Sequence, residues 1–241
     1  DWKMKLLTMM FREPSSEWYG KKGISCIGIM VLQVVPADFD HSILGNSATV
    51  SEKQFVISFY DLITDDSKQD AYSVACAKLQ VYARLCDHPI PDLKVHTVYE
   101  EEDGAGCFAG LWGRSSIRYY KDWTQEIESD GEGATFLSVK AVSFGEAQDN
   151  KSFLDSHFAY IGKAVAKGVT SSKGSAVSAS GCVAAVKRAN LRSSQCWEFT
   201  PDRAFEKKGV KGDLDYEKMS WTENVDVVIR GIQYTGQKSR N

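Results

Sequence analysis

Three short apolar runs shape the first part of the chain, each of the length of a β-strand. They span residues 2–10, 24–35 and 55–63, and they are partly β-branched or aromatic. Turn-forming residues separate them, including Pro14, Gly20 and Gly45. Apolar runs bounded in this way are typical of strands. The sequence therefore predicts that the fold begins as an antiparallel meander.

The spacing of apolar residues then changes to that of helices. Two predicted helices, over residues 65–86 and 146–167, each carry apolar residues on one face. These are Val74, Ala77, Val81 and Leu85 in the first, and Leu154, Phe158, Ile161 and Val165 in the second. Asp65 and Asp66 are expected to cap the first helix, and Pro89 and Pro91 to end it. Between the two helices we predict a strand over 93–99, a helix over 107–128 and a strand over 136–144.

This order predicts a mixed α/β fold, a central sheet with helices on its faces. We assign residues 1–167 to the core. Residues 168–181 are small and rich in serine and glycine, which indicates a flexible loop. Residues 182–241 form a basic C-terminal extension, with a short helix over 182–189 and a last strand over 225–234.

Charge and cysteine content narrow the class of protein. The net charge is −3, but residues 163–211 hold ten Lys and Arg against three acids. Such a segment is either a footprint for a polyanion or a solvated basic face. Six cysteines without a C-x-x-C pair indicate reduced thiols in a cytoplasmic or nuclear protein, without a structural zinc. No apolar run reaches the roughly 18 residues of a membrane span, so we expect no membrane partner.

Three acids fall at comparable places in the predicted order of elements. Asp1 lies in or just before the first strand, Asp103 closes the fourth, and Glu146 closes the fifth. Ends of neighbouring strands meet at one edge of a sheet, so these carboxylates can converge. Carboxylate oxygens suit Mg²⁺ or Mn²⁺, and a pair of such ions supports phosphodiester chemistry. The alternative is that each acid is a solvated turn residue.

Several segments together carry a resemblance to a family. They are DWKMK at 1–5, FRE at 11–13, WYGKKGIS at 18–25, EDGAGCF at 102–108 and EAQDNKSFLDSHFA at 146–159. The chain up to about residue 160 resembles DDE-type transposases, transposon-encoded proteins with an RNase H-like catalytic core. Two positions depart from the family pattern: Glu102 replaces a small polar residue, and Asn150 replaces a glycine.

The resemblance implies an RNase H-like mixed sheet flanked by helices. It also implies that Asp1, Asp103 and Glu146 hold two Mg²⁺ or Mn²⁺ ions, with Asp1 bridging them. The expected reaction is attack of water or a DNA 3′-hydroxyl on a phosphodiester, which gives hydrolysis or strand transfer in DNA recombination. DNA is the expected partner, bound by a homo-oligomer in the nucleus. A strand that contains Asp1 also implies that the native protein extends upstream.

Five further residues are expected near the substrate or the metals. Lys151 would contact a phosphate, unless it is simply solvated, and Asp155 would support the metal ligands. His157 would contact substrate, unless it is an ordinary partly buried histidine. Lys187 and Arg188 in the basic extension would bind DNA.

Two rival functions remain open. A decayed transposon copy would keep the fold as a DNA- or protein-binding domain without catalysis. A cysteine hydrolase would use Cys107, which lies among small residues between a predicted strand and a predicted helix. Ala105 and Ala109 stand where a nucleophile elbow has glycines, and the nearby acids would raise the pKa of the Cys107 thiol.

Overall fold

The chain forms two units of mixed secondary structure in a computed structural model. The structure describes residues 2–6, 9–10, 23–45, 49–50, 55–86, 88–95, 97–102, 138–144, 153–172, 175–201, 226–229 and 232–234. One unit comprises Asp1–Gln69 and Lys151–Pro201, and the other Asp70–Asn150 and Asp202–Asn241. The predicted mixture of strands and helices is confirmed. The predicted boundaries at 167 and 182 do not coincide with the units, because residues 151–201 belong with the N-terminal strands.

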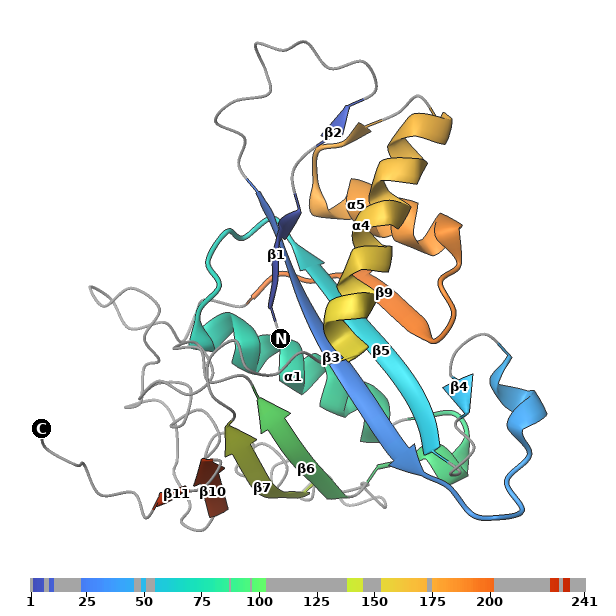
Figure 1. Cartoon of the computed structure of the whole chain (residues 1–241), viewed down its shortest axis with the longest axis vertical. Coiled ribbons are helices and arrows are strands. Elements are labelled where there is room, and N and C mark those ends of the chain that lie inside the picture. The colour runs from blue at the N-terminus through green and yellow to red at the C-terminus, as the bar shows by residue number, and fades with distance from the viewer. Residues whose placement is uncertain are drawn as a thin grey trace, which may run out of the picture. The chain divides into compact units, whose positions relative to one another are not determined.

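The first unit is built on a five-stranded sheet (Figure 1). Its strands are β1 (Trp2–Leu6), β3 (Ile24–Val34), β4 (Thr49–Val50), β5 (Phe55–Thr64) and β9 (Ser194–Glu198). The path β1-β3-β5-β4 is antiparallel, and β9 adds to β5 in parallel. β2 (Met9–Met10) pairs separately with β8 (Ser175–Ala176), and a 3-10 turn, η2, spans His41–Leu44. The predicted meander of β1, β3 and β5 is therefore confirmed.

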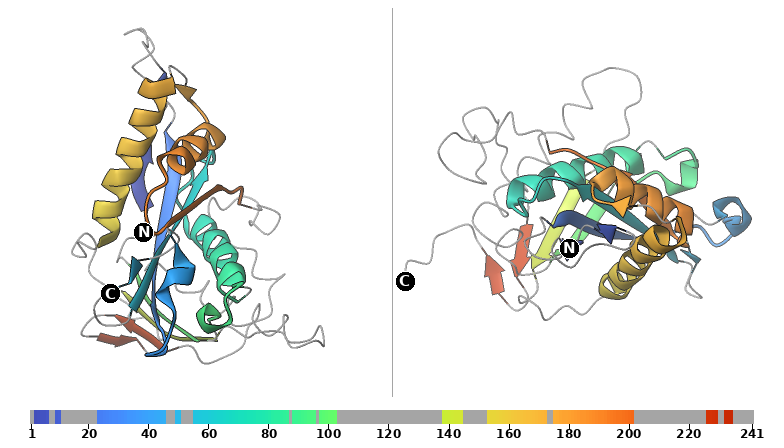
Figure 2. Two further views of the ribbon diagram at one scale, coloured as in Figure 1. Left: turned by 90° about the vertical axis from the view of Figure 1, so that its right-hand side faces the viewer. Right: turned by 90° about the horizontal axis from the view of Figure 1, so that it is seen from above.

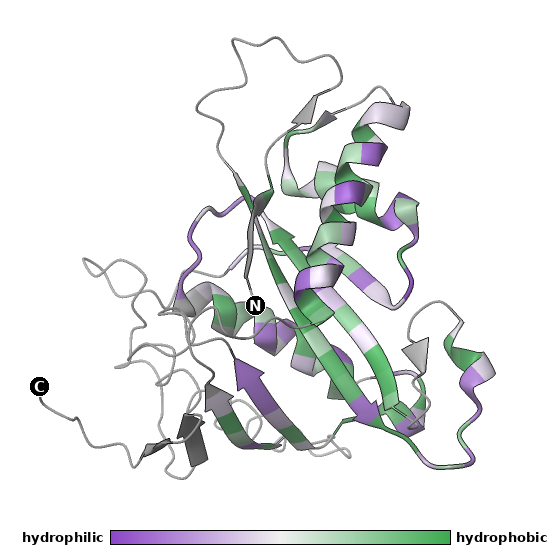
Figure 3. Cartoon of the chain, in the orientation of Figure 1, coloured by the Kyte–Doolittle hydropathy of each residue, from purple (hydrophilic) through white to green (hydrophobic). Residues whose placement is uncertain are grey.

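Two helices, α4 (Phe153–Ser172) and α5 (Ala179–Ala189), cover one face of this sheet (Figure 2). Their apolar faces join those of β3 and β5 in one buried cluster, which includes the predicted Leu154, Phe158, Ile161 and Val165. The apolar colour of β3 and β5 in Figure 3 follows the same core. The helical spacing in the sequence thus identified the buried face of α4.

The second unit has its own sheet, in the order β11-β10-β7-β6. The elements are α1 (Ala71–Cys86), η3 (Pro91–Leu93), β6 (Thr97–Glu102), β7 (Ser138–Phe144), β10 (Asp226–Ile229) and β11 (Ile232–Tyr234). β6, β7 and β10 are parallel, whereas β11 returns antiparallel to β10. The single strand predicted over 225–234 is therefore two strands that pair with each other.

Two boundaries differ from the prediction for local reasons. α1 begins at Ala71 because Asp70, and not Asp65 or Asp66, caps it: the Ser73 amide donates to Asp70 Oδ1 at 2.9 Å. β6 starts at Thr97 because residues 91–93 form a 3-10 turn, in which the Leu93 amide donates to the Ile90 carbonyl at 3.0 Å. The predicted helix over 107–128 lies outside the described residues.

The flexible loop predicted over 168–181 is wrong where the structure describes it. Residues 168–172 complete α4, 175–176 form β8, and α5 already begins at Ala179. Val169, Ala176 and Ala179 are buried in the core of the first unit. The small residues serve close packing: a Cβ at Gly168 would lie 2.7 Å from that of Ala185 on α5. No helix of the described residues is long and apolar enough to cross a membrane.

The contact between Gly168 and Ala185 gives a prediction. Gly168→Ala should destabilise the protein by about 1–3 kcal/mol, because the added methyl overlaps Ala185. This sign is opposite to the gain of about 1 kcal/mol that alanine gives at an ordinary helical position. Urea unfolding measures the effect. Adding Ala185→Gly to the variant should restore part of the loss, and a stabilising Gly168→Ala would contradict the packing.

Candidate functional site

The acidic end of β6 is tied to helix α1 by buried ion pairs. Lys78 Nζ donates to Glu100 Oε2 at 2.7 Å and also pairs with Glu102 Oε1. Glu100 and Glu102 lie two apart, so they share one face of the strand. Tyr99 and Glu101 on the other face are exposed. The polar colour of β6 contrasts with the apolar strands of the first unit (Figure 3).

Among the described residues, this cluster holds two carboxylates and one ammonium. Its side chains are only 11% exposed for Lys78 and 7% for each glutamate. Glu100 Oε1 is buried and accepts no hydrogen bond from the part of the chain that the structure describes. Buried charges are stable when they are paired, and here one ammonium serves two carboxylates. The end of β6 is therefore both rigidly held and favourable to a further positive charge.

The parallel pairing of β6 and β7 brings their carboxyl ends together. Glu102, the last residue of β6, pairs with Phe144, the last residue of β7. Asp103 follows Glu102 directly, and Glu146 follows Phe144 by two positions. Ligands of parallel sheets bind at this edge, beyond the carboxyl ends of the strands.

Four of the predicted site residues cannot be placed. Asp1, Asp103, Glu146 and Lys151 lie outside the described residues. Among the residues that are described, no group of three or more His, Cys, Asp or Glu side chains could hold a metal ion. The hard oxygen donors at the end of β6 nevertheless fit the chemistry of Mg²⁺ or Mn²⁺.

A second polar cluster lies inside the first unit, centred on Asp61 of β5. Its carboxylate is fully buried, and its Oδ2 accepts from Ser194 Oγ at 2.7 Å and lies 2.8 Å from His157 Nε2. The imidazole stacks on Phe59, with ring centroids 4.1 Å apart. The cluster therefore joins α4 and β9 to the middle of the sheet.

The geometry of this cluster excludes a serine protease type of triad. In such a triad the serine bonds to the imidazole, whereas Ser194 donates to Asp61 instead. His157 is 6% exposed and faces Asp61, which argues against the predicted substrate contact. The ring is positioned to form a hydrogen bond with the buried carboxylate. Asp61 is not among the residues predicted from the sequence, although an acid inside the apolar run FVISFYDLIT is a visible signal.

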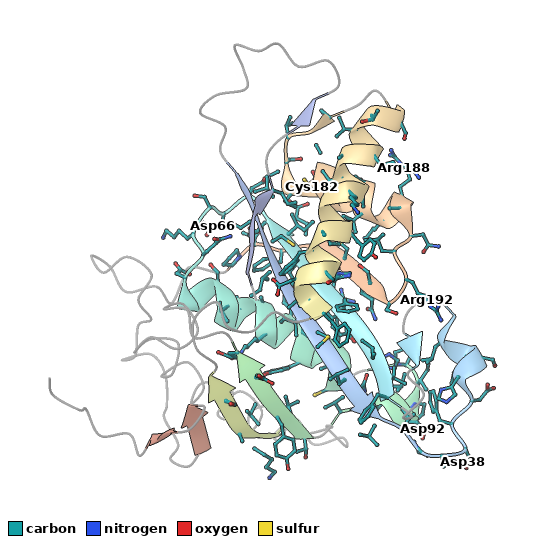
Figure 4. The ribbon with its side chains drawn as sticks, in the orientation of Figure 1. Asp38, Asp66, Asp92, Cys182, Arg188 and Arg192 are labelled. Atoms are coloured by element: carbon teal, nitrogen blue, oxygen red, sulfur yellow. The ribbon has the colours of Figure 1, made fainter. Side chains whose placement is uncertain are left out.

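The remaining described candidates are exposed. Asp155 lies in the first turn of α4. Lys187 and Arg188 lie in the last turn of α5, where cations offset the partial negative charge of the helix end. Arg188 extends outward from α5, and Arg192 from the turn that follows (Figure 4). These exposed cations are accessible to a polyanion in solution.

Two thiols of the first unit, Cys182 and Cys196, are buried and hard to ionise. Burial, and next the charge of Asp65, raises the pKa of Cys182 to about 11. Burial, and next the charge of Asp61, also raises the pKa of Cys196. Because the thiolate is the nucleophile, neither residue suits covalent catalysis. Cys107, the predicted alternative nucleophile, lies outside the described residues.

Comparison of the chain with protein-family models, with curated proteins and with solved structures gives no match.

The contacts of the Asp61 cluster predict that the free energy of unfolding depends strongly on both Asp61 and His157. His157→Phe should destabilise the protein by about 3–5 kcal/mol, because it leaves a buried carboxylate without its main partner. The double variant with Asp61→Val should recover much of that loss, since it removes the charge as well. Chemical denaturation measures both. Ser156→Ala, at an exposed neighbour, is the control, and simple additivity of the two core changes would refute the coupling.

The raised thiol pKa values predict slow alkylation in the folded state. At pH 8 about one Cys182 thiol in a thousand is ionised, so Cys182 and Cys196 should react with iodoacetamide far more slowly than the half-buried Cys76. Peptide mass spectrometry gives the order of labelling, and all three should react at similar rates in denaturant. Equal rates in the folded protein would contradict the burial.

Proposed function

We propose that the chain is a metal-dependent enzyme of DNA phosphodiester chemistry, of the DDE transposase kind. The observation that carries the proposal is the register of β6 and β7, which end opposite each other at Glu102 and Phe144. The two acids that resemble catalytic carboxylates, Asp103 and Glu146, follow these ends by one and two residues. A parallel pair in this register supports a common metal site for both.

The order of elements adds support. An antiparallel meander, a helix, two parallel strands and a long helix follow one another along the chain, in the order expected from the resemblance to an RNase H-like core. The single central sheet of that expectation is not seen in the described part of the chain, because β6 and β7 pair in a separate sheet from β1, β3 and β5. Asp1 precedes the first strand of this order, and its part in the site stays a prediction from the resemblance. The exposed cations of α4 and α5 support DNA as the substrate.

The proposed chemistry divides the work between the carboxylates and the bound ions. Bound Mg²⁺ or Mn²⁺ would supply the activation of the attacking hydroxyl and the stabilisation of the leaving oxygen. Asp103 and Glu146 would hold the ions. Lys78 would fix the end of β6 through Glu100 and Glu102, so that the residue after the strand is presented in one place. A DNA-binding domain without catalysis is the alternative, and the exposed basic residues of α4 and α5 alone would serve it.

Metal affinity tests the proposal. Asp103→Asn and Glu146→Gln should each weaken Mn²⁺ binding at least about tenfold, because each removes a charged ligand. Calorimetry or the electron paramagnetic resonance of free Mn²⁺ measures the affinity. Glu101→Gln is the matched control, since it removes an exposed acid from the same run and should change little.

Cleavage of a labelled DNA duplex in Mn²⁺ then distinguishes the proposed enzyme from a non-catalytic DNA-binding domain. The two ligand variants should lose cleavage while Glu101→Gln keeps it. Unchanged Mn²⁺ affinity in both ligand variants would refute the metal site. Metal binding without cleavage would favour the non-catalytic alternative.

A further inference from the structure

The exposed side of α4 carries a continuous row of basic, hydroxyl and aromatic side chains. It consists of Ser156, Tyr160, Lys163, Lys167 and Thr170, which we call the α4 stripe. Their spacing of four, three, four and three keeps them on one face of the helix. All five are exposed, whereas the opposite face of α4 is buried in the core. The stripe is therefore a rigid surface fixed by the packing of the helix beneath it.

Tyr160 is the unusual member of the stripe. It is 58% exposed, although large aromatic side chains usually lie in the core. Lys163 Nζ lies over its ring, 5.7 Å from the centroid. This distance is within the range of a cation–π contact, which keeps the ammonium beside the ring. The stripe thus presents an aromatic surface and a positive charge side by side.

The charge around the stripe is not a consequence of composition. The chain has 29 Lys and Arg and 32 Asp and Glu, yet residues 156–197 contain six bases and no acid. The described bases of this segment, on α4, on α5 and on the turn after α5, are all exposed: Lys163, Lys167, Lys187, Arg188 and Arg192. Apart from Asp155 in the first turn of α4, the described residues of α4 and α5 expose bases and no acid. Such a surface on a chain of net negative charge favours a polyanionic partner.

We propose that the α4 stripe and the cations of α5 bind an unpaired strand of DNA, with a base stacked on Tyr160. The cations would contact phosphates, and the exposed ring would receive the face of a base. Base faces are accessible in a single strand but covered by their neighbours in a duplex. The inference rests on the proposed function for the identity of the polyanion, and it adds both the surface and the preference for an unpaired strand.

The composition of the stripe favours nucleic acid over a membrane surface. Helices that lie on membranes expose large apolar residues beside their cations, so that these residues insert between lipids. Besides Tyr160, the large apolar side chain that α4 exposes is Phe153, at its first position. The other uncharged members of the α4 stripe are Ser156 and Thr170. The hydroxyl of Thr170 is moreover turned to the Ala166 carbonyl at 2.9 Å.

Fluorescence anisotropy tests the proposal on the full chain. A labelled oligothymidine and a duplex of the same length are titrated in EDTA, so that no metal site is required. Tyr160→Leu should weaken binding of the single strand about tenfold, because it removes one stacked base while keeping an apolar side chain. Binding of the duplex should change little. Tyr160→Phe, which keeps the ring, should bind the single strand as well as wild type.

The two lysines of the α4 stripe can be tested separately, through the salt dependence of binding. Lys163→Gln and Lys167→Gln should each reduce the slope of log affinity against log salt concentration by about 0.7 for the single strand. Tyr99→Leu is the matched control for the aromatic change. Tyr99 is 75% exposed but stands in the acidic strand β6, so its loss should leave binding unchanged.

Several results would overturn the inference. They are an undiminished affinity of Tyr160→Leu for the single strand, an equal loss for the duplex, or an equal effect of Tyr99→Leu. If Tyr160→Leu abolished binding to anionic phospholipid vesicles and left oligothymidine binding intact, the α4 stripe would be a membrane-binding surface instead. If single-strand binding depends on Tyr160 while Asp103→Asn keeps Mn²⁺ affinity, the surface stands and the proposed catalytic site fails. If instead Tyr160→Leu leaves single-strand binding unchanged while Asp103→Asn loses Mn²⁺ affinity, the proposed catalytic site stands and the proposed role of the α4 stripe fails.

Discussion

The arrangement of the first unit depends on the absence of a side chain at Gly28. A Cβ at this position would lie 2.6 Å from the ring of Phe158 and 3.0 Å from Leu154, so α4 could not approach β3. Gly28 pairs in register with Asp61 on β5. The close approach of the helix at this point accompanies the bond from His157 to the Asp61 carboxylate, 2.8 Å long. One small residue thus permits both the packing of α4 and the buried hydrogen bond between His157 and Asp61.

Patterns within a short segment could be predicted from the sequence, and contacts between distant segments could not. The buried face of α4 follows from its helical spacing, and the strands β3, β5 and β7 from their apolar runs. The bond between Asp61 and His157 joins positions 96 apart, which no local pattern encodes. Asp65 shows the same limit: expected to cap α1, it accepts instead from the Ala179 amide at the start of α5, at 2.8 Å. The small residues of 168–181 were misread because close helix packing and flexible loops use the same residue types.

Charge is divided between the two units in a way that suits the proposed function. The described strand end in the second unit carries two buried glutamates, while α4 and α5 in the first unit expose bases without acids between them. The proposed metal-dependent enzyme would use both features, cations for the phosphates and carboxylates for metal ions. Net charge alone, at −3, conceals this division.

The Lys78 cluster shows why a fixed acidic strand end differs from a run of solvated acids. Solvated carboxylates in water interact weakly with a distant cation, because water screens them. Glu100 and Glu102 are largely withdrawn from water, and Lys78 compensates only one of the two charges. The remaining charge acts through a medium of lower effective dielectric constant, so its attraction for a cation near the end of β6 is stronger. In the proposed enzyme, Glu100 and Glu102, of which Glu102 departs from the family pattern, would therefore strengthen the field in which Asp103 binds metal, without needing to be ligands themselves.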